Sequence, residues 1–248
     1  MSDITVVVLT KNEEDHIVDV IKNAQELTDK VLIVDSGSTD KTVELAEENK
    51  SKVVCRVWDN DFSAQRNFAL KHVETDWVLY LDADERMSDK LIDNIRLAIE
   101  KEPTIYKFKR INNAFGKSFK YGVLGPDSVI RLFPTDQGYW EGKVHEKIIC
   151  NLPLKVLDGH IEHYTYNDFD EYLTKMNMYS AIGAVKNYEV GKKARYIKDF
   201  IFRPFFAFIK MYILKKGFLE GWIGFVLCLN YANYTLNKYV KLMLMEKK

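Results

Sequence analysis

The chain has 248 residues, of which 47% are hydrophobic and 13% aromatic, and this length and composition exclude a disordered segment and a disulfide-stapled miniprotein. The 36 basic and 36 acidic residues balance overall, but residues 1–191 hold 24 basic and 33 acidic residues, whereas residues 192–248 hold 12 and 3. An acidic body therefore precedes a basic tail, and such a tail indicates an anionic partner surface, either nucleic acid or membrane.

The cysteines and the apolar segments limit where the protein works. Cys55, Cys150 and Cys228 lie far apart, which argues against a zinc site or a disulfide framework and favours a reducing, cytoplasmic setting. No basic segment precedes the apolar residues 6–9, so we expect no signal peptide. The longest uncharged stretch of the tail, residues 221–237, is 17 residues long and holds three asparagines. We therefore expect peripheral membrane contact and no membrane-spanning helix.

The first hundred residues alternate between strand and helix patterns. Residues 4–9 are almost wholly apolar, and the apolar spacing within residues 12–24 predicts a helix. The alternation continues with strands over residues 31–34, 52–57 and 77–81 and helices around residues 42–46 and 63–73. It predicts an α/β fold whose mainly parallel sheet is flanked by helices. Ligands bind such sheets beyond the carboxyl ends of the strands, where Asp35 and Asp82 share one expected crevice.

The rest of the chain has a different pattern. After a helix over residues 91–99, four strands separated by glycine, proline and asparagine turns are expected over residues 105–110, 116–123, 129–133 and 155–161. This part is expected to supply the pocket for a second substrate. Helix-forming residues return from Asp168, and the chain becomes basic and densely aromatic from Lys192.

Three acids directly follow the strand that ends at Leu81. Asp82 and Asp84 form an Asp-x-Asp pair, which at a strand end can hold Mg²⁺ or Mn²⁺ with positions left open for phosphate oxygens. The alternative is a solvated loop whose carboxylates cap the next helix. The Asp35 loop and the Gln-Arg-Asn segment at residues 65–67 favour a nucleoside diphosphate site, because that ligand needs base, ribose, metal and cation contacts together.

In order and spacing, these segments resemble the family 2 glycosyltransferases of GT-A fold. The resemblance rests on Leu9-Thr10-Lys11-Asn12-Glu13-Glu14, Val34-Asp35-Ser36-Gly37-Ser38-Thr39-Asp40, Gln65-Arg66-Asn67 and Asp82-Ala83-Asp84-Glu85. Arg131-Leu132-Phe133, Gly142-Lys143-Val144-His145-Glu146 and Ile161-Glu162-His163-Tyr164 resemble the branch that contains lipopolysaccharide inner-core β-glucosyltransferases. The Gln-x-x-Arg-Trp signature of processive members is not found, which leaves transfer of a single sugar.

The resemblance implies the chemistry and the residues that perform it. It implies an inverting transfer from a nucleotide-sugar, most simply UDP-glucose or another UDP-hexose, to a saccharide or glycolipid acceptor such as a lipopolysaccharide core, with Mn²⁺ or Mg²⁺. Donor contacts are expected from Thr10, Glu13, Asp35, Gln65, Arg66 and Asp82, and metal ligands are Asp82, Asp84 and His163. Glu146 is the candidate base that takes the proton of the acceptor hydroxyl, with Asp127 as second choice.

Several of these residues have a structural alternative. Glu146 can instead pair with a neighbouring lysine on a surface turn. Arg131 and His145 are candidates for contacts with the acceptor or a phosphate, or else form an ordinary ion pair and a structural hydrogen bond. His163 has a similar alternative to metal binding. His160 is expected to be structural.

We divide the chain into a nucleotide-sugar-binding half (residues 1–100), an acceptor-binding half of the same domain (101–167) and a helical extension (168–248). The basic, aromatic extension suits an anionic membrane surface, an RNA groove, or a second core or oligomer contact. We favour the membrane and no nucleic acid, because the resemblance implies a lipid-linked acceptor. The protein is then cytoplasmic and peripheral on the inner face of the cytoplasmic membrane, with homo-oligomer contact through the extension left open.

Two other functions are weighed against the enzyme. A nucleotide-sugar-binding or membrane scaffold protein would keep the fold without turnover. A sugar nucleotidyltransferase would carry a glycine-rich phosphate loop near the N-terminus, where this chain has Thr10-Lys11-Asn12-Glu13.

Overall fold

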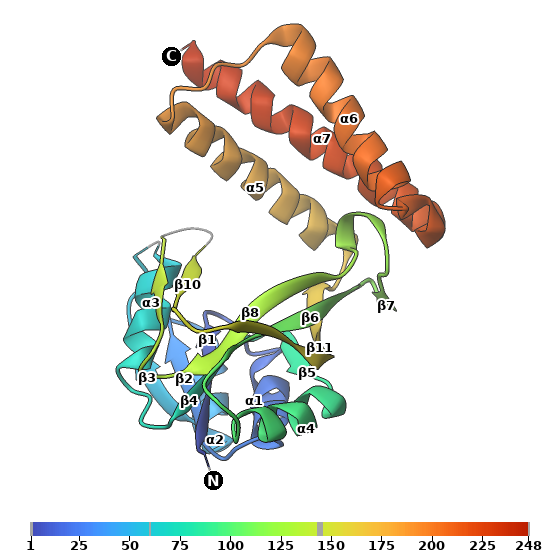
Figure 1. The fold of residues 1–248 in the computed structure, drawn as a ribbon. Helices are drawn as coiled ribbons and strands as arrows, with labels where there is room; N and C mark the ends of the chain where they lie inside the picture. The colour runs from blue at the N-terminus through green and yellow to red at the C-terminus, as the bar shows by residue number, and fades with distance from the viewer. Residues whose placement is uncertain (1, 60, 143–145, 248) are drawn as a thin grey trace. The chain divides into compact units, whose positions relative to one another are not determined.

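The computed structural model describes residues 2–59, 61–142 and 146–247 of the chain. The chain forms two compact units, drawn in Figure 1. The first, here the α/β unit, comprises Met1–Arg110 and Asp127–His163, and the second, the helical unit, comprises Ile111–Pro126 and Tyr164–Lys248. Residues 111–126 thus group with the helical unit, whereas the sequence had placed them in the acceptor-binding half.

Four parallel strands form the first part of the sheet, in the order β3-β2-β1-β4. They are β1 (Ile4–Thr10), β2 (Val31–Asp35), β3 (Lys52–Cys55) and β4 (Trp77–Asp82). The central strands read as runs of valine, isoleucine and leucine because helices or further chain cover both faces. This half of the sheet is the one that the alternating sequence pattern predicts.

The register places the expected acids at one edge. Thr10 pairs with Asp35 across β1 and β2, and Leu9 pairs with Asp82 across β1 and β4. Asp35 and Asp82 therefore flank the end of β1, two strand spacings or about 10 Å apart. The prediction that both acids lie at the carboxyl ends of the parallel strands is confirmed.

Four further strands continue the sheet beyond β4, in the order β8-β6-β11-β5, with antiparallel pairing of β4 with β8, of β8 with β6 and of β11 with β5. Their bounds are β8 (Asp127–Pro134), β6 (Ile105–Ala114), β11 (Leu154–Tyr166) and β5 (Glu85–Met87), while β7 (Lys117–Ser118) pairs with the end of β6. A separate ribbon joins β9 (Tyr139–Glu141) to β10 (Lys147–Ile149). β6 and β11 begin in the α/β unit and end in the helical unit.

Helices cover both faces of the parallel strands. On one face, apolar residues of α1 (Ile17–Gln25), α2 (Thr42–Glu48) and α4 (Asp89–Ala98) share a core with β1 and β4. On the other, α3 (Phe62–Leu70) and Trp140 of β9 pack over Val7, Val78 and Tyr80. The α/β fold class with a C-terminal helical extension is confirmed.

The helical unit is built on α7 (Gly221–Glu246), which packs against both α5 (Phe169–Glu189) and α6 (Arg203–Ile209). α5 starts where predicted, since the Asp168 carboxylate accepts the Glu171 N–H at 2.8 Å and caps the helix. Two π-helical segments, η2 (Tyr196–Phe202) and η3 (Lys210–Leu214), flank α6. Short 3₁₀ turns are η1 (Gly122–Leu124) and η4 (Gly217–Glu220). None of the described helices is long and apolar enough to cross a membrane.

Some predicted elements differ from the structure. α1 begins at Ile17 and not near residue 12, because Asn12 has a φ of +56° and lies outside helical geometry. The strand expected over residues 116–123 is wrong: only Lys117–Ser118 is a strand, and Gly116 and Gly122 turn the chain with φ values of +70° and +71°. The short strands β5, β9 and β10 were not predicted.

Candidate active site

The Asp35 carboxylate organises the loop that follows β2. Its Oδ2 accepts the backbone N–H groups of Gly37 and Ser38 at 2.8 and 2.9 Å, and its Oδ1 accepts the Thr10 hydroxyl at 3.3 Å. Gly37 has a φ of +90°, which residues with a side chain rarely adopt. Asp35 is buried, so its charge is stabilised by these donors and the loop is fixed at the strand end.

The segment after β1 is tied to the same loop. Asn12 donates its backbone N–H to the Ser38 hydroxyl at 2.8 Å, and its side-chain oxygen accepts the Thr39 N–H at 2.8 Å. The N–H of Glu13 donates to the Thr42 hydroxyl at 2.7 Å. Two loops that are distant in sequence therefore form one wall at the carboxyl ends of β1 and β2.

Gln65 fastens α3 to this wall. Its Nε2 donates to the Ser36 hydroxyl at 2.9 Å and to the Arg56 carbonyl at 3.0 Å, while its Oε1 accepts from Arg56 Nη1 at 2.6 Å. The side chain is fully buried and uses both ends of its amide. Gln65 therefore ties α3 to the Asp35 loop through Ser36.

Arg66 is a buried guanidinium between two aromatic rings. Its Cζ lies 5.3 Å from the centre of the Tyr80 ring and 4.7 Å from that of Trp140, and the residue is 3% exposed. The Asn67 side chain holds Trp140 in place, because its Nδ2 donates to the Trp140 carbonyl at 2.7 Å and its Oδ1 accepts the Trp140 N–H at 2.8 Å. Arg66 donates to Asp82 Oδ1 at 3.1 Å and to Glu146 Oε1 at 3.2 Å.

Asp82 lies between two arginines. Arg66 reaches its Oδ1, and Arg131 donates to its Oδ2. Burial raises the pKa of Asp82, but the charges of Arg131 and then Arg66 outweigh burial and hold that pKa well below its ordinary range. Asp82 is therefore ionised at neutral pH.

Glu85 continues the network on the buried side. Its Oε1 accepts from Arg131 at 3.1 Å and from Arg110 at 3.0 Å, and its Oε2 accepts the Asp82 N–H at 3.0 Å. Arg110 also forms a bidentate pair with Asp127, at 2.9 and 2.7 Å. The result is an ion-pair chain of alternating sign: Glu146, Arg66, Asp82, Arg131, Glu85, Arg110 and Asp127.

Asp84 points to the other expected metal ligand. Its Oδ2 lies 3.3 Å from His163 Nε2, and both side chains are partly exposed. The antiparallel pairing of β5 with β11 causes this contact, because it sets His163 opposite Glu85. Among the described residues no group of three or more His, Cys, Asp or Glu side chains is placed to hold a metal ion. The pair fits a Mg²⁺ or Mn²⁺ ion that takes its remaining ligands from a diphosphate, since such ions commonly use one or two carboxylates plus substrate phosphates.

Comparison with known proteins identifies the family. The family model for glycosyl transferase family 2 matches residues 5–152. The chain belongs to glycosyltransferase family 2. The match covers the parallel strands, both loops of the wall and Glu146, so the resemblance seen in the sequence is confirmed.

Relatives match this glycosyltransferase over most of its length. An uncharacterized glycosyltransferase of Rickettsia typhi is 28% identical over 242 residues, covering 91% of this chain and 82% of the relative. The lipopolysaccharide core biosynthesis glycosyltransferase LpsC of Rhizobium meliloti is 26% identical over 238 residues, covering 92% and 87%. A crystal structure of S. aureus TarS residues 1–349 with UDP is 17% identical, with a TM-score of 0.47, covering 99% of this chain and 91% of that one.

The structure brings most of the predicted site residues of this glycosyltransferase to one region. Glu146 forms an ion pair with Arg66, as described, and Lys143, one of the lysines raised as an alternative partner, lies outside the described residues. Arg131 forms ion pairs with Asp82 and Glu85, which is the structural alternative raised for it, and its contact with an acceptor stays a prediction. His160 bonds Glu162 at 2.7 Å. His145 lies outside the described residues.

Sequence reasoning assigned no role to several residues of this site. The sequence showed Glu85 only as the last residue of the acidic motif and indicated no role for it. Arg110 and Trp140 gave no signal, since they reach the site through strand pairing and through packing against α3. A search for charged residues within the strand expected over residues 105–110 would have found Arg110.

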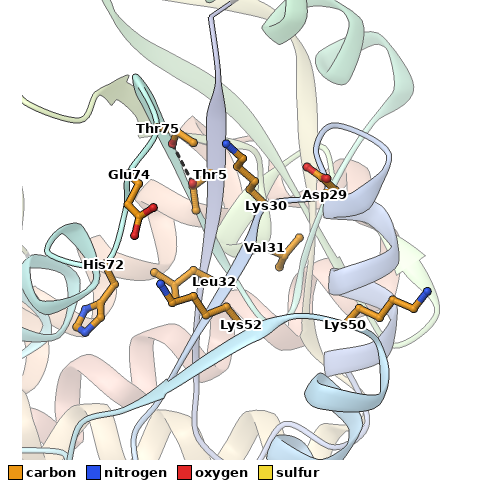
Figure 2. Close-up of a pocket in the computed structure, with 10 residues that line it drawn as sticks. All are labelled: Thr5, Asp29, Lys30, Val31, Leu32, Lys50, Lys52, His72, Glu74 and Thr75. Carbon is orange, nitrogen blue, oxygen red and sulfur yellow. Dashed lines mark hydrogen bonds between the residues drawn. The ribbon is translucent and has the colours of Figure 1, made fainter.

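A cavity of about 280 Å³ lies at the opposite edge of the sheet, shown in Figure 2. Thr5, Val31 and Lys52 line it from the first residues of the parallel strands, and the Thr5 and Thr75 hydroxyls lie 2.8 Å apart beside it. Lys30 in its wall is already paired with Asp3. Because ligands of such sheets bind at the carboxyl ends, this cavity is not the donor site of the glycosyltransferase.

Proposed function

We propose that the protein transfers a single hexose, with inversion, from a UDP-sugar to a saccharide acceptor in a metal-dependent reaction. The observation that carries the proposal is the position of Arg66, which contacts both the Asp82 carboxylate of the acidic motif and Glu146, 64 positions further along the chain. Membership of family 2 supplies the reaction class. The proposal assigns each group near Arg66 a part in that reaction.

The donor is proposed to bind along the wall at the ends of β1, β2 and β4. Asp35 and Thr10, with Glu13 beside them, face the nucleoside, and Arg66 faces the diphosphate. Buried Arg66 Nη1 and Arg131 Nε have no hydrogen-bond partner among the described residues. Buried donors without partners are costly, and a ligand rich in oxygen acceptors would satisfy them.

Glu146 is proposed as the base. In an inverting transfer the acceptor hydroxyl attacks the anomeric carbon in line with the departing UDP, and a carboxylate on the attacking side takes the hydroxyl proton. The 3.2 Å hydrogen bond from Arg66 orients the Glu146 carboxylate for this step. Asp127 is the weaker candidate, because both of its oxygens accept from Arg110.

Asp84 and His163, with Asp82 beside them, are the residues that would hold Mn²⁺ or Mg²⁺. A bound divalent cation would offset the charge that develops on the leaving diphosphate. Arg66 and Arg131 contribute fixed positive charge on the same side of the site, although each is already shared with a carboxylate.

For the acceptor we propose a lipid-linked saccharide of the lipopolysaccharide core type, met at the inner face of the cytoplasmic membrane. The support is the likeness to LpsC, whose name assigns it to lipopolysaccharide core biosynthesis. Glucose is the proposed sugar because the motif segments resemble the branch that contains lipopolysaccharide inner-core β-glucosyltransferases.

A donor screen tests the proposal. Hydrolysis of UDP-, GDP- and ADP-sugars is followed with and without Mn²⁺ for the wild type, for Asp84→Ala, and for Asp158→Ala as the matched control. Asp158 pairs with Lys90 on an exposed surface and lies outside the proposed site. We expect Mn²⁺-dependent hydrolysis of one UDP-hexose in the wild type and the control only. UDP-sugar binding without turnover, with or without saccharide acceptors, would favour the scaffold protein.

A further inference from the structure

The helical unit exposes an unusual apolar surface. Between residues 196 and 229 many large apolar side chains are exposed to solvent. Six of those that are at least half exposed define what we call the aromatic face: Ile197, Ile201, Phe202, Phe205, Phe206 and Trp222. Trp222 reaches 77% exposure. A soluble protein rarely leaves so many large apolar groups in water unless they bind a partner or a membrane.

The inner side of the same helical segment is already packed. Phe200 contacts the cluster of Ala184, Tyr239 and Leu242, and the Arg203 guanidinium lies 4.9 Å from the centre of the Tyr239 ring. The segment is therefore apolar on both sides. Its inner side packs within the helical unit, and the aromatic face stays exposed to solvent.

Within the segment that carries the aromatic face, the exposed charges are positive. Within residues 196–229 the carboxylates are Asp199 and Glu220, both buried, and they pair with Arg203 and Lys117. The exposed cations include Lys198, Lys210, Lys215 and Lys216. A partner of this surface must therefore accept apolar side chains and carry negative charge.

Three lysines converge on a cavity beside the face. A cavity of about 310 Å³ is lined by Lys120, Lys215 and Lys216, together with Tyr121 and Leu214. No acidic side chain lines it. Among the described residues, none of the three ammonium groups has a carboxylate within ion-pair distance. The cavity thus offers uncompensated positive charge at the edge of an apolar surface.

The walls of this cavity are held rigidly. Glu220 Oε1 accepts the backbone N–H groups of Lys120 and Tyr121 at 2.8 and 2.9 Å, and the Gly122 N–H donates to the Lys215 carbonyl at 2.8 Å. These bonds join the loop at residues 120–126 to the turn at residues 214–216. The backbone that carries the three lysines is therefore tied together before any ligand arrives.

Close packing of glycines supports the same turn. A Cβ on Gly217 would lie 2.7 Å from the Cys228 sulfur, and one on Gly224 would lie 2.1 Å from the Gly217 carbonyl oxygen. Only glycine permits this approach of the turn to α7. The cavity is thus a built feature of the helical unit.

We infer that the aromatic face and the lysine cavity together bind an anionic lipid bilayer, with a lipid phosphate in the cavity and acyl chains against the apolar side chains. Aromatic residues with a flanking belt of lysines suit the boundary between headgroups and acyl chains. The inference rests on the proposed function only in that a lipid-linked acceptor gives the protein a reason to visit the membrane.

Two other partners fit the surface less well. A second copy of the chain, docked through the same patch, would set lysines against lysines across a two-fold axis. RNA would use the cations and the aromatic rings, but isoleucine side chains such as Ile197 and Ile201 offer no ring on which a base can stack. An anionic bilayer satisfies both the apolar and the charged parts.

Vesicle sedimentation tests the inference with the full chain and no sugar donor. Vesicles of phosphatidylcholine alone are compared with vesicles that contain 30 mol% phosphatidylglycerol. The variants are Lys120→Gln/Lys215→Gln/Lys216→Gln for the cavity and Phe205→Ser/Phe206→Ser/Trp222→Ser for the face. The matched control is Lys22→Gln/Lys71→Gln/Lys155→Gln, which removes the same charge from exposed lysines of the α/β unit.

We expect the wild type and the control to bind only the anionic vesicles, and to be released by salt. The cavity variant should bind about 100-fold more weakly, because each lysine near an anionic surface contributes roughly a fivefold factor. The face variant should lose binding as well. Circular dichroism and donor hydrolysis without lipid, measured on each variant, separate this result from misfolding and from failure of the proposed function.

Several outcomes would overturn the inference. Equal losses in the cavity and control variants would mean that only net charge matters. Failure of the wild type to sediment with anionic vesicles would remove the lipid partner. Binding of a single-stranded RNA oligomer, or self-association that the face variant abolishes, would assign the surface to one of the other partners.

Discussion

Glu85 offers a sharp test of the ion-pair chain. It is fully buried, and Glu85→Gln keeps its shape while removing the charge that compensates Arg110 and Arg131. Removing one partner of a buried pair costs about 3–5 kcal/mol. Because glutamine retains an acceptor oxygen, we expect a loss of about 3 kcal/mol in the free energy of unfolding, at the lower end of that range. For a chain of this size, this corresponds to a fall in melting temperature of about 6–12 °C.

Asp127→Asn provides the matched control. Asp127 binds the same arginine through two hydrogen bonds, but its side chain is 49% exposed. Water can solvate the Arg110 guanidinium at this exposed position, so we expect the free energy of unfolding to change by about 1 kcal/mol or less. Thermal and urea unfolding followed by circular dichroism measure both variants. If Glu85→Gln lowers stability no more than Asp127→Asn does, burial of Glu85 between the arginines is not what stabilises this region.

Two further predictions concern carboxylates that contact Arg66. Glu146→Gln should lower kcat by at least about 100-fold while UDP-sugar affinity, measured by calorimetry, stays unchanged; a parallel loss of affinity would mean that Glu146 only positions Arg66. Burial raises the pKa of Asp82, but the charges of Arg131 and Arg66 outweigh burial and hold that pKa below its ordinary value. The ion pairs of Asp82 therefore stabilise the fold fully above about pH 4 and progressively less as the pH falls below that value. Asp82→Asn should therefore reduce the loss of unfolding free energy between pH 7 and pH 3, and an unchanged loss would contradict this.

The parallel half of the fold could be predicted because its signals are local. The apolar strand that precedes Asp35 and the one that precedes Asp82 each carry their own pattern, and the topology rule then places both acids at one edge. The helix expected from residue 12 begins later, since Asn12 is needed to bind the loop at Ser38 and Thr39. Local propensity gives way there to a contact between distant segments.

The rest of the site depends on strand register, which the sequence does not reveal. Arg110 meets Asp127 because β6 and β8 pair antiparallel with those residues opposite each other. His163 reaches Asp84 through the pairing of β11 with the three-residue strand β5, which is too short to predict. Composition likewise indicated a basic aromatic tail, but not that Lys120, far away in the sequence, would join Lys215 and Lys216.

The contact between Gly217 and Cys228 gives the helical unit a built-in chemical reporter. Cys228 is buried against this turn, and burial raises the pKa of its thiol to about 11, so little thiolate is available at neutral pH. Cys55, in contrast, is exposed. With Cys55 and the partly exposed Cys150 replaced by serine, the rate at which a thiol reagent modifies Cys228 would follow the opening of the turn that carries Lys215 and Lys216. Reagent protection could thus register motion of the lysine cavity without any label being introduced.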